Sequence, residues 1–203
     1  MHLIPTVITN DGRGERAYDI YSRLLKDGIV FVRGIIDDDM ATTITAQLLF
    51  LENEAPERDI QVYINSPGGS VTSALSIYDA MQYVQPKVAT LCTGMAASGG
   101  SILLAGGAEG MRMSLPHAQI LIHQPFTQGI QGQATDIQIH AQEILRQREQ
   151  IARIYAKHCK RELEDVERAL ERDFFMTPEQ AREWGLIDLI VDKNPHVVAP
   201  AAV

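Results

Sequence analysis

The sequence predicts an α/β fold built on a largely parallel sheet. Short runs rich in β-branched residues alternate with segments of helical periodicity along the 203 residues. Turn residues separate these segments, and neither low-complexity sequence nor internal repeats interrupt the alternation. Strands separated by helices form βαβ units, and the strands of such units run parallel. A chain of this length can bury a sizeable core within one domain.

The N-terminal half of the chain contains three expected strands, at residues 29–32, 60–64 and 88–92. Asp37 begins a helix expected over 37–53, because acidic side chains cap helix N-termini and apolar residues then recur at helical spacing. A dense turn signal, NSPGG at 65–69, follows the second strand. Ser70 then caps a second helix, which ends before Pro86.

The C-terminal half continues this alternation, with strands expected at 119–123 and 186–191. A capping-box sequence at 135–138 (TDIQ) opens a helix through about residue 158, which is long enough to project beyond a small core. A second capping box at 177–180 (TPEQ) opens a short helix, and Gly185 ends it.

Composition argues against several classes of function. The net charge is -8 and basic residues do not cluster, so we expect no nucleic-acid partner. CxxC and HExxH motifs are missing from the sequence, so we expect no metal site. Two cysteines make no disulfide framework and indicate a reducing compartment; with no secretory signal, we expect a cytoplasmic protein. We interpret Cys92 as a small core residue and Cys159 as a surface residue.

The uncharged span from 88 to 108 is long enough to cross a bilayer. Its glycines dilute the hydrophobicity and are spaced like turns. We therefore expect a buried strand, a turn and a buried helix in this span, and no membrane segment.

Ser98 lies at the predicted strand-to-helix turn of this span, within GMAASGG. A serine at such a turn can be a nucleophile, because backbone N–H groups converge there to stabilise an oxyanion. It can equally be an ordinary N-cap residue, and on local sequence alone that interpretation is the simpler one. The glycines at 68 and 69 can likewise present N–H groups to a substrate or form a plain turn.

His123 is the best general-base candidate among the histidines, because it ends a strand and α/β sites form at strand carboxyl ends. A lone histidine there is also compatible with a purely structural role. Asp173 could orient it: it follows a charged helix and precedes Phe174, so that it could be partly buried.

Several motifs, in this order, resemble the proteolytic subunit of the ATP-dependent Clp protease, the ClpP family of serine peptidases. The resemblance covers nearly the whole chain. It rests on RGERAYDIYSRLL (13–25), DIQVYINSPGG (59–69), GMAASGG (94–100), HQP (123–125), GQATDI (132–137) and ERD (171–173).

The resemblance implies a serine endopeptidase that hydrolyses unfolded polypeptides to short peptides. Ser98 is then the nucleophile, His123 the general base and Asp173 the orienting acid. Gly69 and Gly99 match the backbone N–H donors of the oxyanion hole. The chain itself needs no cofactor, since in this family ATP is used by the partner, a hexameric AAA+ unfoldase of the ClpX, ClpA or ClpC type.

The implied fold is the crotonase-like ClpP fold, a βαβ spiral forming one peptidase domain over 1–203. Residues 1–18 would be a mobile axial loop, in keeping with the polar, glycine-bearing sequence of 9–15, and 194–203 a flexible tail. A strand and long helix over 124–158 would form a handle that joins two heptameric rings into a tetradecamer.

The sequence departs from the family pattern at two places near the site. Glycine occupies position 99, where family members usually have methionine, and FTQG at 126–129 replaces a segment with two adjacent glycines. The unfoldase-docking cleft keeps apolar or aromatic residues, although Gln61 and Thr93 are more polar than expected. The matching positions are Tyr63, Tyr83, Leu91, Met113, Leu115 and Ile190.

Three functions remain open at this point. The first is an active serine endopeptidase ring. The second is a weakly active or non-catalytic paralogous subunit that needs a partner ClpP subunit, which the changes at Gly99 and 126–129 suggest. The third is a crotonase-type acyl-CoA enzyme, which would use carboxylates, and no acidic residue lies near Ser98 in sequence.

Overall fold

The computed structural model describes residues 3–10, 14–127 and 129–193. Its centre is a seven-stranded sheet in which β3, β4, β5, β6 and β9 follow one another, while β7 pairs with both β5 and β8. All of these pairings are parallel except that of β7 with β8, so the α/β class with a largely parallel sheet is confirmed. The strands are β3 (Ile29–Ile36), β4 (Ile60–Gly69), β5 (Val88–Ala97), β6 (Arg112–Ser114), β7 (Gln119–Ile122), β8 (Phe174–Met176) and β9 (Leu189–Ile190).

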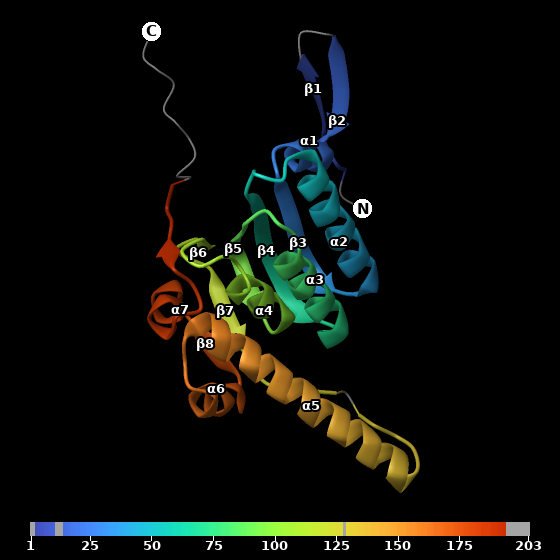
Figure 1. Ribbon diagram of the computed structural model, residues 1–203, viewed down its shortest axis with the longest axis vertical. Helices are drawn as coiled ribbons and strands as arrows, with labels where there is room; N and C mark the ends of the chain where they lie inside the picture. The colour runs from blue at the N-terminus through green and yellow to red at the C-terminus, as the bar shows by residue number, and fades with distance from the viewer. Residues whose placement is uncertain (1–2, 11–13, 128, 194–203) are drawn as a thin grey trace.

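Helices pack on this sheet, and one of them extends far beyond it (Figure 1). The buried residues of α5 lie in its C-terminal part, whereas Ile137 and Ile139 near its start are exposed. The expected projecting helix is thus present. The helices are α1 (Ile20–Lys26), α2 (Asp38–Glu54), α3 (Val71–Tyr83), α4 (Gly99–Ala105), α5 (Ala134–Cys159), α6 (Leu163–Leu170) and α7 (Pro178–Trp184).

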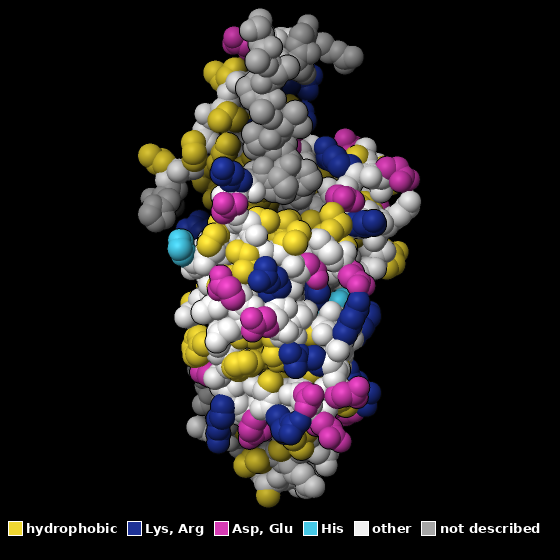
Figure 2. Space-filling view, turned by 90° about the vertical axis from the view of Figure 1, so that its left-hand side faces the viewer, with side chains coloured by type: hydrophobic (Ala, Val, Ile, Leu, Met, Phe, Trp, Pro, Cys, Tyr) yellow, Lys and Arg dark blue, Asp and Glu magenta, His cyan; other side chains and the backbone are white. Residues whose placement is uncertain are grey.

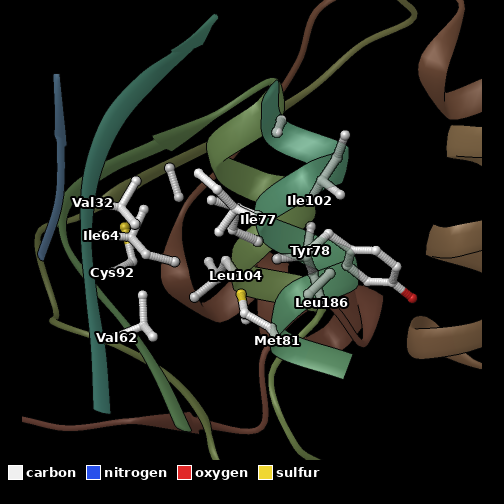
Figure 3. Packing of buried hydrophobic residues seen from close by; sticks show 14 of the residues in the cluster. Val32, Val62, Ile64, Ile77, Tyr78, Met81, Cys92, Ile102, Leu104 and Leu186 are labelled. Carbon is white, nitrogen blue, oxygen red and sulfur yellow. The ribbon is translucent and has the colours of Figure 1, made fainter. Parts of the chain in front are cut away.

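The main core lies between the sheet and the helices α3 and α4 (Figure 3). Val32, Ile64 and Cys92 of three adjacent strands point toward Ile77 of α3 and Leu104 of α4, and all five are almost fully buried. Cys92 is therefore a core residue, as predicted. Alternate residues of the buried strands face this layer, which is why their sequences are so rich in β-branched side chains.

The predicted turn at 65–69 is wrong, because these residues continue β4. Ile35 and Ile36 of β3 pair with Gly68 and Gly69 after a register shift. Gly34 lies within the shift and Gly68 directly follows it, with φ of +83° and +93°, and a Cβ on Gly69 would lie 2.1 Å from the carbonyl oxygen of Ile36. The glycines thus serve a close backbone approach between strands, which local sequence cannot distinguish from a turn.

Two further boundaries differ from expectation. The capping box at 135–138 does not form: α5 begins at Ala134, Gln133 is its N-cap without a side-chain hydrogen bond, and Thr135 lies inside the first turn. The strand expected at 186–191 shortens to β9, because Leu186 and Ile187 are buried in the core beside the left-handed turn at Gly185. By contrast, the Thr177 capping box and the Asp37 and Ser70 caps are all present.

Both projecting segments differ in detail from the implied fold. Part of the expected N-terminal loop forms an antiparallel hairpin of β1 (Thr6–Asn10) and β2 (Glu15–Asp19), while 11–13 lie outside the described residues. The described residues of 123–133 contain no strand, so the strand expected to accompany the long helix is not present among them. The hairpin and α5 project from opposite ends of the molecule (Figure 1). The tail 194–203 is outside the described residues.

The span 88–108 forms β5, the turn at Ser98 and α4, as expected. Among the described helices, none is both long enough and apolar enough to cross a membrane. Figure 2 shows that acidic and basic side chains are mixed over the face it presents, with apolar side chains between them.

Candidate active site

Ser98 is held in an unusual backbone conformation between β5 and α4, with φ 53° and ψ −121°. A non-glycine residue in such a region costs about 1–3 kcal/mol and persists only where its surroundings fix it. Here the Ser98 N–H donates to the Leu121 carbonyl at 2.9 Å, and the Ser98 carbonyl accepts from the N–H groups of Ser101 and Ile102. Ser98 is the N-cap residue of α4, as the simpler interpretation expected, but its side chain makes no cap hydrogen bond, so helix capping does not account for its hydroxyl. A strained strand-to-helix turn is typical of exposed nucleophiles.

Two glycine-bearing segments meet at Ser98. A Cβ on Gly68 would lie 2.7 Å from the Ser98 Cβ, so the end of β4 packs directly against the serine. Below it, the fully buried Ser66 donates through Oγ to the Gly34 carbonyl at 2.6 Å and accepts from the Gly68 N–H at 3.0 Å. No local sequence pattern pointed to this role of Ser66.

Gly99 begins α4, where the first N–H groups of a helix have no acceptor within the helix. Its position is crowded: a Cβ would lie 2.9 Å from the Cβ of Ala74 and 3.5 Å from the Cδ1 of Ile36. The candidate oxyanion residues Gly69 and Gly99 therefore lie on adjoining segments packed too tightly for side chains. We infer that Gly99 is constrained by packing, although it has no side chain of its own.

Strand register places Ser98, His123 and Asp173 at one edge of the sheet. Ala97 of β5 pairs with Leu121 of β7 in parallel, so Ser98 and His123 both lie just beyond these strands. Ile122 of β7 pairs with Phe174 of β8 in an antiparallel manner, which sets the preceding Asp173 beside His123. The Nδ1 atom of His123 lies 3.6 Å from Oδ1 of Asp173.

The environments of these two side chains differ. The His123 side chain is 15% exposed and its ring lies 5.7 Å from that of Phe126, whereas the Asp173 side chain is 63% exposed. The expected partial burial of Asp173 is therefore wrong, since its side chain lies at the surface beside β8. The distance of 3.6 Å between the two groups is short enough for an ion pair when His123 is protonated. It is longer than the donor–acceptor distance of an ordinary hydrogen bond, about 2.7–3.2 Å.

Further contacts brace the segment that carries Asp173. The Gln124 N–H donates to the Leu170 carbonyl at 2.8 Å, and its side-chain amide donates to the Glu171 carbonyl at 3.1 Å. Arg148 of α5 pairs with the Glu171 carboxylate at 3.1 Å. Gln124 and Glu171 lie within two of the quoted motifs, HQP and ERD, but their mutual contact was not foreseen because it joins segments 47 residues apart.

Four of the six residues of the expected docking cleft line one cavity of about 250 Å³. These are Tyr63, Leu91, Met113 and Leu115, and the more polar Gln61 and Thr93 line it too. Ile190 lies on the adjoining strand β9, where it pairs with Ser114 of β6. Tyr83 is not on the cavity wall and is 79% exposed at the end of α3.

Both cysteine thiols and the imidazole of His158 lie away from this edge, and burial shifts the pKa of each. Burial raises the pKa of Cys92 to about 11 and that of Cys159 to about 12. Cys159 is only 7% exposed, so its predicted surface position is wrong: it packs beneath the Gly185 turn. Burial also lowers the pKa of His158 to about 4. The Nε2 atom of His158 lies 2.8 Å from the Tyr78 hydroxyl oxygen. Among the described residues, no cluster of three or more potential metal ligands occurs.

The chain is similar to a known protein family. The model of the family described as Clp protease matches residues 12–194, which is nearly the whole chain.

Proposed function

Since the chain belongs to the Clp protease family, we propose that it is the proteolytic subunit of an ATP-dependent protease, with Ser98 as nucleophile. The family supports a ClpP-like peptidase, and thus a hydrolase. The observation that carries the finer proposal is the register of β5, β7 and β8, which gathers Ser98, His123 and Asp173 at one sheet edge. Its substrates would be unfolded polypeptides, cut to short peptides.

The mechanism follows from the arrangement of these groups. Asp173 lies on the Nδ1 side of His123, which leaves Nε2 to accept the Ser98 proton. The Ser98 Oγ attacks the peptide carbonyl, and the N–H groups of Gly69 and Gly99 hold the resulting oxyanion. The C–N bond then breaks, His123 protonates the leaving amine, and an acyl-enzyme remains on Ser98. Water, deprotonated by His123, hydrolyses that ester and restores the serine.

Exposed apolar side chains support assembly of several copies. Ile137, Ile139 and Leu145 are exposed on α5, and Leu49 and Phe50 are exposed on α2. Large apolar side chains left exposed on a folded chain are candidates for burial in an interface. We propose heptameric rings that stack through α5 into a tetradecamer. The 250 Å³ cavity would dock a hexameric AAA+ unfoldase, which uses the ATP and feeds the chamber.

A second candidate is a weakly active or non-catalytic paralogous subunit that needs a partner ClpP subunit. The separation of 3.6 Å between His123 and Asp173 and the exposure of Asp173 favour it, since neither describes a fully aligned triad. The Clp protease assignment favours either candidate over a crotonase-type acyl-CoA enzyme.

Labelling by a fluorophosphonate and hydrolysis of a short fluorogenic peptide test the proposal. Ser98→Ala is expected to abolish both, and His123→Ala to slow hydrolysis at least 10³-fold. His117→Ala, which removes an exposed histidine outside the site, is the matched control and should leave both rates unchanged. Hydrolysis that survives Ser98→Ala would overturn the assignment. Rings that form but are not labelled, even with an unfoldase or partner paralogue, would favour the second candidate; robust labelling of the chain alone would exclude it.

A further inference from the structure

A buried pair of hydroxyl groups connects the long helix α5 to the turn that carries Ser98. Ser101 in the first turn of α4 and Tyr155 on α5 are 0% and 1% exposed, and their hydroxyl oxygens lie 2.7 Å apart. The Ser101 Oγ also lies 2.7 Å from the Ser98 carbonyl oxygen and 2.9 Å from the Leu121 carbonyl oxygen. The Leu121 carbonyl is the same one that accepts from the Ser98 N–H.

Counting protons fixes the direction of these hydrogen bonds. The two carbonyl oxygens can only accept, so a proton shared with them must come from Ser101. If the Ser101 hydroxyl instead donated its proton to Tyr155, no proton would lie between the Ser101 oxygen and either carbonyl oxygen. Both short contacts would then bring oxygen lone pairs together, which is unfavourable. The Tyr155 hydroxyl therefore donates to Ser101, and Ser101 shares its single proton between the carbonyl oxygens of Ser98 and Leu121.

The Ser98 carbonyl belongs to the same peptide group as the Gly99 N–H. Because a peptide group is planar, fixing the direction of its oxygen also fixes the direction of its N–H. A hydrogen bond that the carbonyl accepts further polarises the N–H. Gly99 has no side chain that could help to orient its N–H group. The tether formed by the hydrogen bonds from Tyr155 through Ser101 supplies that orientation instead.

We propose that Tyr155 is a positioning residue whose hydroxyl, through Ser101, aims the Gly99 N–H at the oxyanion. This inference rests on the proposed function of Ser98. This arrangement also makes catalysis sensitive to the position of α5. Tyr155 lies on that helix, which projects from the molecule, and its hydroxyl is the first donor in the series of hydrogen bonds.

Tyr155→Phe is the most direct test, because it removes the hydroxyl and keeps the ring that packs edge-on against Trp184. We expect kcat for a short peptide to fall about tenfold, part of the 10²–10³ lost when an oxyanion donor is removed, with KM within about twofold. Ser101→Ala should have a similar effect. The double variant should be no slower than the slower single variant, because both changes break one chain of hydrogen bonds.

Tyr78→Phe is the matched control. It also removes a nearly buried hydroxyl that contacts a residue of α5, His158, but this contact does not reach Ser98. Its kcat should equal that of the parent protein. Unchanged kcat in Tyr155→Phe, an equal loss in Tyr78→Phe, or additive losses in the double variant would overturn the inference while leaving the assignment of Ser98 intact.

Amide hydrogen exchange of the segment 98–102 gives a readout that does not depend on activity. Exchange should accelerate in Tyr155→Phe and Ser101→Ala relative to the parent, and not in Tyr78→Phe. If the parent protein neither hydrolyses peptide nor reacts with a fluorophosphonate, the proposed function fails and exchange alone decides whether the tether holds this turn. Equal exchange in all variants would refute the tether.

Discussion

Replacing Gly99 by alanine tests whether packing, and not glycine's freedom, defines the turn after Ser98. The added Cβ would lie 2.9 Å from the Cβ of Ala74, closer than such atoms approach in folded proteins, and 3.5 Å from Ile36, an ordinary contact. The steric clash is therefore mainly with one methyl group, that of Ala74 on α3. Overpacking of this kind costs about 1–3 kcal/mol, so we expect Gly99→Ala to lower the free energy of unfolding by that amount.

The identity of the clashing atom makes the prediction sharp. Ala74→Gly removes the methyl group that would clash. In that background Gly99→Ala should lower the free energy of unfolding by less than about 0.5 kcal/mol, or raise it, since replacing glycine by alanine reduces the entropy of the unfolded chain. Ala74→Gly alone should cost about 1 kcal/mol through helix propensity. Gly110→Ala is the control: a Cβ there meets nothing within 4 Å, so its cost should be the same in both backgrounds.

Urea unfolding followed by circular dichroism, at one protein concentration because the chain is expected to assemble, measures all of these variants. A coupling energy of about 1–3 kcal/mol between positions 74 and 99 would support the reasoning. Equal costs of Gly99→Ala in both backgrounds would refute it, since the collision with Ala74 would then not determine the effect.

Three further perturbations have defined outcomes. Gly68→Ala should reduce fluorophosphonate labelling at least hundredfold, because its Cβ would lie 2.7 Å from that of Ser98, whereas Gly34→Ala, with a similar φ of +83° and open space, should label normally. His158 titrates near 4 when folded and near 6.5 when unfolded, so the unfolded chain binds more protons between these values and stability falls as the pH drops from 6.5 to 4. The loss should be about 1–3 kcal/mol and should vanish in His158→Gln; identical pH profiles would contradict it. Since burial raises the pKa of both Cys92 and Cys159, iodoacetamide at pH 8 should alkylate them only in urea, and rapid labelling of the folded chain would show that they are accessible.

Local patterns predicted most of the central sheet and the capped helices, because the causes of these elements are local. Asp37, Ser70 and Thr177 cap helices through hydrogen bonds that span three residues, so their sequence signatures are confirmed in the structure. The β-branched runs predicted where β3, β4, β5 and β7 begin, since these residues suit a sheet that is covered by helices. The position of Ser98 at a strand-to-helix turn followed from the same periodicities.

The turn signal at 65–69 shows where this reasoning ends. Its residues suit a turn, but pairing with β3 extends β4 through Gly69, because the close approach of Ile36 requires glycine. Similarly, the basic neighbours of Cys159 suggested a surface position, and only packing against the Gly185 turn showed that it is buried.

The α/β class, the strand ends that carry Ser98 and His123, and the resemblance to the Clp protease family could all be recognised from the order of the residues alone. The tertiary structure decided which strands are neighbours, and thereby set Asp173 beside His123 through the antiparallel pairing of β7 with β8. It also placed Tyr155 beneath the turn that carries Ser98, 54 residues beyond Ser101. Hydrogen bonds between strands and between buried side chains join residues that are distant in the chain, so periodicity and capping, which act over a few residues, carry no information about them.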